Sequence, residues 1–154
     1  MRIRKTGRKT AMVAGMVAVA GMVAAQTSNP RIGRWKLKQD APPPAVNVMT
    51  YEPAGDGMKV TVDSVNASGQ QTHWTYTTML DGKDAPIAGY ATADTAAVTK
   101  VDATTNEIVY KKNGKVAQTA TNVLSADGRT LTVTFHRTNA QGQPVTTAAV
   151  YEKQ

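Results

Sequence analysis

The chain has 154 residues, no cysteine and a formal net charge of +7. The lack of cysteine excludes disulfide bonds and lipid attachment at a lipobox, so the core must supply the stability of the fold. Five of the 18 basic residues lie within residues 1–10, and the rest of the chain carries 13 basic against 11 acidic residues, a net charge of +2. A field this weak argues against nucleic acid as a partner.

Residues 1–25 have the pattern of a signal peptide. A basic segment, residues 1–10, is followed by an uncharged stretch rich in Ala, Val and Gly, residues 11–25. The stretch is shorter than the ~20 residues that a membrane-spanning helix needs, and Val23-Ala24-Ala25 offers the small residues that a signal peptidase requires. We expect cleavage near Ala25, a secreted or periplasmic mature chain and no membrane span in it. An uncleaved anchor is the alternative, which the scarcity of Leu and Ile disfavours.

The remaining residues predict one domain. Residues 26–31 are polar and are expected to form a flexible leader. Residues 32–154 have the length of a single domain with one core.

Glycine-containing turn signals divide this domain into short segments rich in Val, Thr and aromatic residues. The predicted hairpin tips are Gly55-Asp56-Gly57, Ala67-Ser68-Gly69, Asp81-Gly82-Lys83, Asn113-Gly114-Lys115, Asp127-Gly128-Arg129 and Gln141-Gly142-Gln143. Apolar and polar residues alternate between the tips, as in residues 58–63 and 131–136, which is typical of strands with one buried face. The expected strands are 32–39, 45–52, 58–65, 71–80, 85–89, 95–102, 107–112, 115–124, 129–138 and 144–153.

These features predict an all-β fold. No segment after residue 25 has helical periodicity, and short links in chain order favour an antiparallel up-and-down meander of about ten strands. A meander of this length removes its unpaired edges best by closing into a barrel, and an open two-sheet sandwich is the alternative. Pro42-Pro43-Pro44 cannot donate to a ladder and is expected to form a stiff connector after the first strand.

Both ends of the domain carry motifs of a known superfamily. Gly33-Arg34-Trp35-Lys36-Leu37 resembles the Gly-x-Trp signature of the calycins, which include lipocalins and fatty-acid-binding proteins. Tyr151-Glu152-Lys153 resembles the closing Tyr-Glu-Lys of intracellular fatty-acid-binding proteins, and residues 106–128 are similar to theirs in turn spacing. The first motif, with the proline-rich connector, also resembles uncharacterised exported bacterial proteins described as lipocalin-like.

The resemblance implies a calycin-like barrel in which Gly33 and Trp35 belong to the structure that closes one end. A large indole suits this place because it supplies apolar area and one N–H group that can find a partner. Fatty-acid-binding proteins hold the ligand carboxylate with an Arg-x-Tyr pair, whereas this chain has Ala149-Val150-Tyr151. The helical lid of that family also has no counterpart between Gln39 and Ala45. The resemblance therefore implies the fold more strongly than the fatty-acid ligand.

No catalytic, cofactor or metal motif is present in the sequence, and we expect a protein that is not an enzyme. His73 and His136 lie on different predicted strands, and a metal site would need a third ligand such as Asp63 or Asp94. Most other acidic residues fall in turns, where carboxylates accept hydrogen bonds from backbone N–H groups.

The mid-strand aromatic residues are the candidate ligand-binding residues, because small-molecule sites are mainly apolar cavities. They are Trp74, Tyr76, Tyr110, Phe135 and Tyr151. The pattern leaves open which strand faces point inward, and a barrel filled by its own side chains is equally compatible with it. The sequence thus predicts an exported binding protein for a small apolar or amphipathic molecule. The alternative is a ligand-free structural or protein-interaction module of the cell envelope, and no pattern indicates an oligomeric state.

Overall fold

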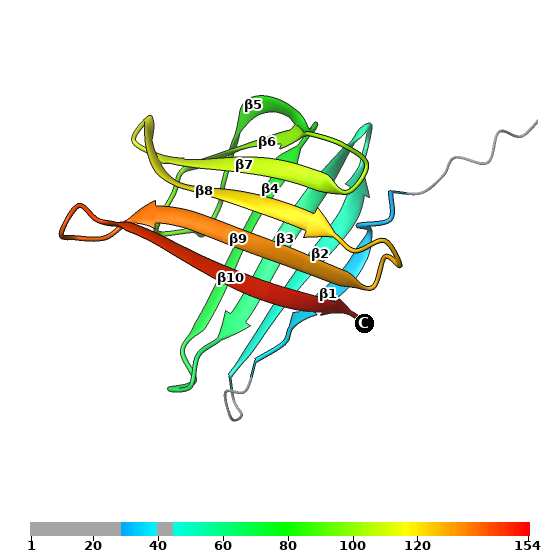
Figure 1. The fold of residues 1–154 in the computed structure, drawn as a ribbon, viewed down its shortest axis with the longest axis horizontal. Helices are drawn as coiled ribbons and strands as arrows, with labels where there is room; N and C mark the ends of the chain where they lie inside the picture. Colours follow the sequence, from blue (N-terminus) through cyan, green and yellow to red (C-terminus); the bar gives the residue numbers. More distant parts are fainter. Residues whose placement is uncertain (1–28, 40–44) are drawn as a thin grey trace, which may run out of the picture.

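The computed structural model describes residues 29–39 and 45–154, which form ten antiparallel strands and no helix (Figure 1). The predicted signal peptide, the first part of the predicted leader and the proline-rich connector lie outside the described residues. The strands are β1 (Gly33–Leu37), β2 (Val46–Ala54), β3 (Gly57–Val65), β4 (Gln71–Thr78), β5 (Asp81–Pro86), β6 (Thr95–Lys100), β7 (Thr105–Lys112), β8 (Lys115–Leu124), β9 (Thr130–Thr138) and β10 (Pro144–Lys153).

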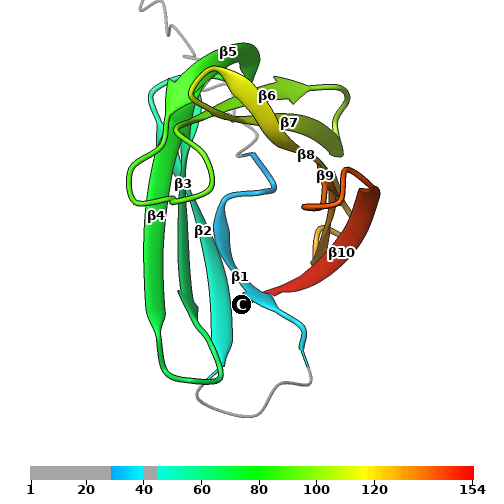
Figure 2. The same ribbon diagram turned by 90° about the vertical axis from the view of Figure 1, so that its left-hand side faces the viewer.

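The strands form one sheet that curls into a nearly closed barrel, which confirms the predicted all-β meander (Figure 2). The order across the sheet is β4-β3-β2-β1-β10-β9-β8-β7-β6-β5. Each strand therefore pairs with its neighbours in the chain, except that β1 pairs with β10 and β4 does not pair with β5. No helix in the part of the chain that the structure describes could cross a membrane.

The predicted alternation places the core inside the barrel. Met58, Val60 and Val62 of β3 are buried, whereas Lys59 and Asp63, on the other face of the strand, are exposed. On β9, Leu131 and Val133 are buried in the same way. Because successive side chains of a strand point to opposite faces, one face of every strand can contribute to a single core.

One predicted hairpin tip is wrong. Asp81-Gly82-Lys83 lies within β5, where the pairing with β6 shifts between Asp81 and Asp84. The chain turns earlier, and Leu80 takes the positive φ of 60° that the turn requires. Gly82 has a φ of 77° and accommodates the bulge instead of a tip. As a result β5 begins four residues before the predicted strand at 85–89.

A single seam interrupts the barrel, between β4 and β5. The loop after β5 closes it: the Thr75 and Ala88 backbones exchange two hydrogen bonds of 3.0 and 2.9 Å. Asp94 fixes the other end of the loop, since its backbone N–H donates to the Lys111 carbonyl at 2.7 Å and its carboxylate accepts from Lys112 Nζ at 2.7 Å. The seam is therefore covered by a tethered loop rather than by a strand ladder.

Candidate functional site

The barrel encloses a cavity of about 370 Å³. Its wall includes seven of the eight aromatic residues in the sequence. The full lining is Leu37, Asn47, Met49, Tyr51, Val60, Val62, Ser64, Thr72, Trp74, Tyr76, Tyr90, Ile108, Tyr110, Asn122, Val133, Phe135, Ala149 and Tyr151. Seven strands and the β5–β6 loop supply the aromatic and polar side chains, so the cavity exists only in the assembled barrel.

All five aromatic residues that the sequence suggested as ligand-binding lie in this wall. They are Trp74, Tyr76, Tyr110, Phe135 and Tyr151. The structure also supplies the direction that periodicity alone left open. Trp74 and Tyr76 lie on the inner face of β4, and Ala149 and Tyr151 lie on the inner face of β10.

Two further aromatic residues of the wall were not among the sequence candidates. In β2, Tyr51 lies at a spacing of two from the apolar residues Met49 and Pro53. The alternation of that strand therefore indicated that Tyr51 shares a face with Met49, which also lines the cavity. Tyr90 lies in the loop between β5 and β6, where no periodicity exists to show its direction. Only the fold around the seam brings Tyr90 to the cavity.

The aromatic rings near the seam are packed against one another. The Trp74 ring lies parallel to those of Tyr90 and Tyr76, with centroid distances of 4.5 and 6.0 Å. The Tyr110 ring presents an edge to Trp74 at 6.4 Å and to Tyr90 at 6.1 Å. Offset-stacked and edge-to-face pairs are the favoured arrangements of aromatic rings. This cluster forms a rigid apolar wall along one side of the cavity.

The buried phenols of the wall remain neutral over the physiological pH range. Burial raises the pKa of Tyr51 to about 12, and it raises the pKa values of Tyr76, Tyr110 and Tyr151 further. Desolvation is the largest cause in each case, because it disfavours the phenolate. Tyr51 accepts a hydrogen bond of 3.1 Å from Asn122 Nδ2, which orients the hydroxyl within the wall.

Trp35 is the residue that the calycin resemblance assigns to the closed end of the barrel. Trp35 is fully buried, and its Nε1 donates to the Arg31 carbonyl at 2.8 Å. Arg31 itself is 3% exposed, and its Nη2 donates to the carbonyls of Thr104 and Asn122 at 2.5 and 3.2 Å. Lys153 Nζ lies 5.2 Å from the centre of the Trp35 ring. The side chain of Arg31, the last residue of the predicted leader, thus belongs to the closed end.

Gly33 makes room for this arrangement. Its φ is +131°, a conformation that favours glycine, and a Cβ there would lie 3.2 Å from Lys153 Cε. A side chain at residue 33 would therefore strain the backbone and press on the lysine that covers Trp35.

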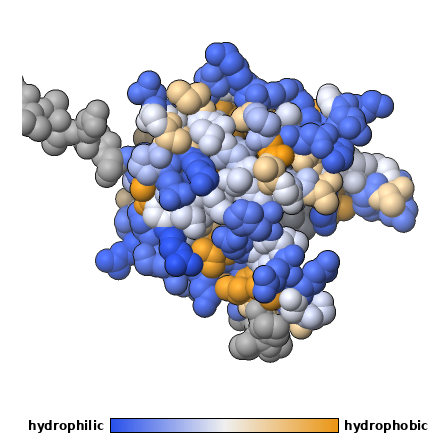
Figure 3. Space-filling view, turned by 180° about the vertical axis from the view of Figure 1, so that it is seen from behind, coloured by the Kyte–Doolittle hydropathy of each residue, from blue (hydrophilic) through white to orange (hydrophobic). Residues whose placement is uncertain are grey.

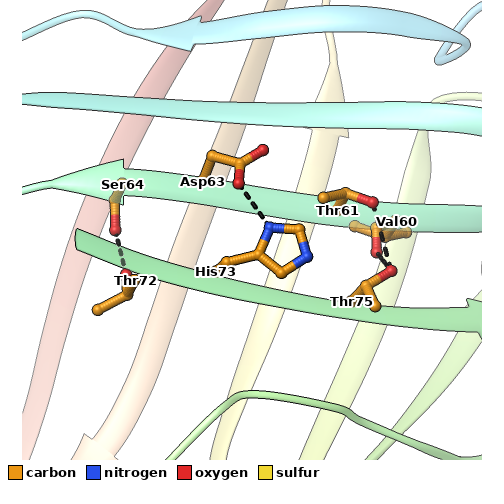
Figure 4. Close-up of polar contacts among 7 residues, drawn as sticks. All are labelled: Val60, Thr61, Asp63, Ser64, Thr72, His73 and Thr75. Carbon is orange, nitrogen blue, oxygen red and sulfur yellow. Dashed lines mark hydrogen bonds and ion pairs between the residues drawn. The ribbon is translucent and has the colours of Figure 1, made fainter.

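The opposite end of the cavity is accessible to solvent. Leu37, Asn47, Ser64 and Phe135 are all half-buried, and Thr72 is exposed. The polar groups at this end are bonded to one another: Ser64 Oγ pairs with Thr72 Oγ1 at 2.5 Å (Figure 4), and the Tyr151 hydroxyl donates to Asn47 Oδ1 at 3.3 Å. The cavity therefore has a closed aromatic interior and an uncharged polar rim.

The two histidines lie outside this cavity. His73 is on the outer face of β4, where Nδ1 lies 2.6 Å from Asp63 Oδ1 (Figure 4). His136 is exposed on β9, and its Nδ1 lies 3.0 Å from Thr146 Oγ1. Across residues 29–39 and 45–154, no group of three His, Asp or Glu side chains is placed to hold a metal ion.

No protein-family model matches the chain, and no curated protein is similar to it in sequence. The likeness to calycins therefore consists of the Gly-x-Trp and Tyr-Glu-Lys motifs together with the nearly closed antiparallel barrel.

Proposed function

We propose that this chain is an exported, calycin-like protein that binds a small apolar or amphipathic molecule inside its barrel. The observation that carries the proposal is the cavity of about 370 Å³, whose wall contains seven of the eight aromatic residues. Ligand sites typically have volumes of ~300–1,000 Å³ and mainly apolar walls with a few polar groups. The large aromatic side chains surround a cavity instead of filling the interior, which favours a ligand site over a solid core.

The arrangement of the two ends supports the same function. Trp35 and Arg31 close one end, and the half-buried rim of Asn47, Ser64 and Phe135 leaves the other end accessible. A molecule entering there would bury its apolar part against the aromatic wall. Burial of apolar area stabilises a complex by about 25 cal/mol per Å² of surface removed from water, before the costs of association.

Binding is tested by titrating the purified protein with an environment-sensitive fluorescent lipid and by mass spectrometry of its organic extract. The expected result is a saturable signal, a co-purified molecule, or both. Ala149→Trp should abolish the signal, because Ala149 lines the cavity and the indole would fill it. Ala148→Trp is the matched control, since its neighbour Ala148 is exposed on β10 and does not line the cavity.

A protein that binds nothing, with unchanged behaviour in the Ala149→Trp variant, would contradict the proposal. That result would favour the alternative of a ligand-free structural or interaction module of the envelope. The surface seen from behind the molecule is mostly polar, with small groups of apolar residues (Figure 3), and it offers that alternative little apolar area.

The export part of the proposal is tested separately. Expression of the full chain in a Gram-negative host, followed by fractionation and N-terminal sequencing, should recover a mature protein that begins near Gln26. Recovery of the uncleaved chain from the membrane fraction would contradict cleavage without affecting the binding proposal.

A further inference from the structure

We infer that the cavity selects an uncharged ligand with a flat ring, in preference to a fatty acid or another anion. This inference rests on the proposed binding function and specifies the ligand of that cavity. It is carried by the residues of the cavity wall, by the place of the nearest buried cation and by the packing of the aromatic cluster.

The cavity wall contains no side chain that is charged at neutral pH. Among the described residues, none that line it is Asp, Glu, Lys, Arg or His. Its polar groups are the phenols, the amides of Asn47 and Asn122, and the hydroxyls of Ser64 and Thr72. The four buried phenols have raised pKa values and stay neutral. A carboxylate in this cavity would lose its hydration without gaining a cation, which is costly.

The one buried cation of the described chain, Arg31, lies close to the wall residue Tyr51 but is not itself part of the cavity lining. Its Nη2 group is engaged by the carbonyls of Thr104 and Asn122 at the closed end. Because Tyr51 and Asn122 line the cavity and Arg31 does not, a ligand in the cavity meets these neutral groups rather than the guanidinium. On β10, the residue two positions before Tyr151 also lines the cavity. It is Ala149, so this position supplies no cation to the wall.

The shape of the wall favours a ring over an aliphatic chain. Trp74, Tyr76 and Tyr90 have nearly parallel rings, with interplanar angles of 9° and 21° relative to Trp74. Tyr110 stands almost perpendicular to Trp74, at 84°. A flat ring can continue this packing with stacked and edge contacts, which contribute about 0.5–1.5 kcal/mol per pair beyond the area buried. A flexible chain gains no such contacts and loses more conformational freedom.

The rim supplies partners for a hydroxyl or carbonyl group on such a ring. Asn47, Ser64 and Thr72 carry neutral donors and acceptors at the accessible end. An uncharged polar group can exchange water for these partners at little cost. The ligand class is thus a ring alcohol or ring ketone rather than an acid.

Four commercial probes separate charge from shape: naphthol, naphthoate, decanol and decanoate. Binding is measured by calorimetry at neutral pH and by quenching of Trp74 fluorescence, with the buried Trp35 as the background. We expect naphthol to bind at least tenfold more tightly than naphthoate and more tightly than decanol. In a Trp74→Phe variant the quenching should disappear while calorimetric binding persists.

Each part of the inference has its own contrary result. Equal affinity for naphthol and naphthoate would overturn the selection against charge, and tighter binding of decanol than of naphthol would overturn the preference for a ring. In both cases the proposed binding function would stand. Failure of all four probes, together with an empty organic extract, would remove that function itself.

A gain-of-function variant tests the reason for the selection. Ala149→Arg places a cation in the wall and should raise the affinity for naphthoate and decanoate at least tenfold. Ala148→Arg, on the outer face of the same strand, should leave both affinities unchanged. If Ala149→Arg does not fold, the natural protein provides the second measurement: naphthoate affinity should rise as the solution approaches pH ~4, where a carboxyl group becomes neutral. Affinities that do not respond to either change would overturn the inference.

Discussion

The closed end of the barrel depends on a buried guanidinium that has no carboxylate partner among the described residues. Arg31 binds backbone carbonyls instead, and the Asn106 amide oxygen lies 3.1 Å from Nε once that amide is oriented to accept. Burial lowers the pKa of Arg31, but a guanidinium remains protonated in proteins. The charge is therefore stabilised by dipoles from two separate segments of the chain, residues 104–106 and Asn122 of β8.

Replacement of this residue should destabilise the protein. Arg31→Met keeps the apolar stem but removes the hydrogen bonds that Nη2 donates to the Thr104 and Asn122 carbonyls, and we expect a loss of about 2–4 kcal/mol in the free energy of unfolding. Urea denaturation measures it. Arg34→Met is the control, because Arg34 is exposed and its loss should change stability by less than about 0.5 kcal/mol. Equal midpoints for the two variants would contradict a structural role for Arg31.

The sequence predicts the place of a single residue only where that residue belongs to an alternating strand or to a recognised motif. Trp35 was predicted from Gly-x-Trp, and Trp74 and Tyr151 from their place in alternating strands. Arg31 was assigned to the leader, because nothing in the local pattern shows that a polar segment folds back over the barrel. Tyr90 was missed for the same reason: its position depends on contacts with Trp74 and Tyr110 that are distant in the chain.

Among the elements, the loop that covers the seam is the least supported. It is joined to β4 through one bridge, Thr75–Ala88, and it places Tyr90 over Trp74. Gly89 makes this close approach possible: its φ is +84°, and a Cβ there would lie 2.3 Å from the His73 carbonyl oxygen. The loop can approach β4 only because residue 89 has no side chain.

Gly89→Ala should therefore detach the loop. We expect a loss of about 2–3 kcal/mol in stability, which combines the strain of a positive φ with a steric clash. Faster amide exchange at Thr75 and Ala88 should accompany it. Gly142→Ala is the matched control, since Gly142 has a similar φ of +78° but no atom lies within 4 Å of the added Cβ. This substitution should lower the free energy of unfolding by only about 1 kcal/mol. Equal effects of the two substitutions would show that contact with β4 is unimportant.

The sequence predicted the elements well where turn chemistry and alternation agreed. Nine strands match the expected segments within a few residues, including β3 and β8, because Asn113-Gly114 and Ala67-Ser68-Gly69 form the tips expected of them. Prediction failed at Asp81-Gly82, where the same residue types form a bulge. The difference arises from Leu80, a residue that rarely adopts a positive φ and does so here under tertiary constraint.

For the whole molecule, the buried phenols set an alkaline limit on stability. The pKa values of Tyr51, Tyr76, Tyr110 and Tyr151 are raised in the folded state, whereas an exposed phenol ionises near pH 10. Above that pH the unfolded chain loses protons that the folded chain retains, so the stability contributed by the neutral phenols is lost as pH rises from about 10 toward the raised values.

Alkaline titration should thus show one cooperative step, in which tyrosinate absorbance and the loss of β-sheet circular dichroism coincide. Tyr76→Phe should move that step to higher pH, because one strongly shifted group is removed. Ionisation of all tyrosines well before unfolding would contradict the enclosed cavity wall.

The sheet order also determines where the first and last strands meet. The first and last strands lie side by side at its centre, and the Gln154 N–H donates to the Arg34 carbonyl at 2.9 Å. A continuous wall therefore cannot form until the final strand has been synthesised, whichever hairpins form earlier. Joining the first and last strands and cutting the two-residue link between β4 and β5 would give a strictly sequential meander. Such a circular permutant would keep every strand pair, and the pairing of β1 with β10 would change from the longest-range contact of the sheet to a local one.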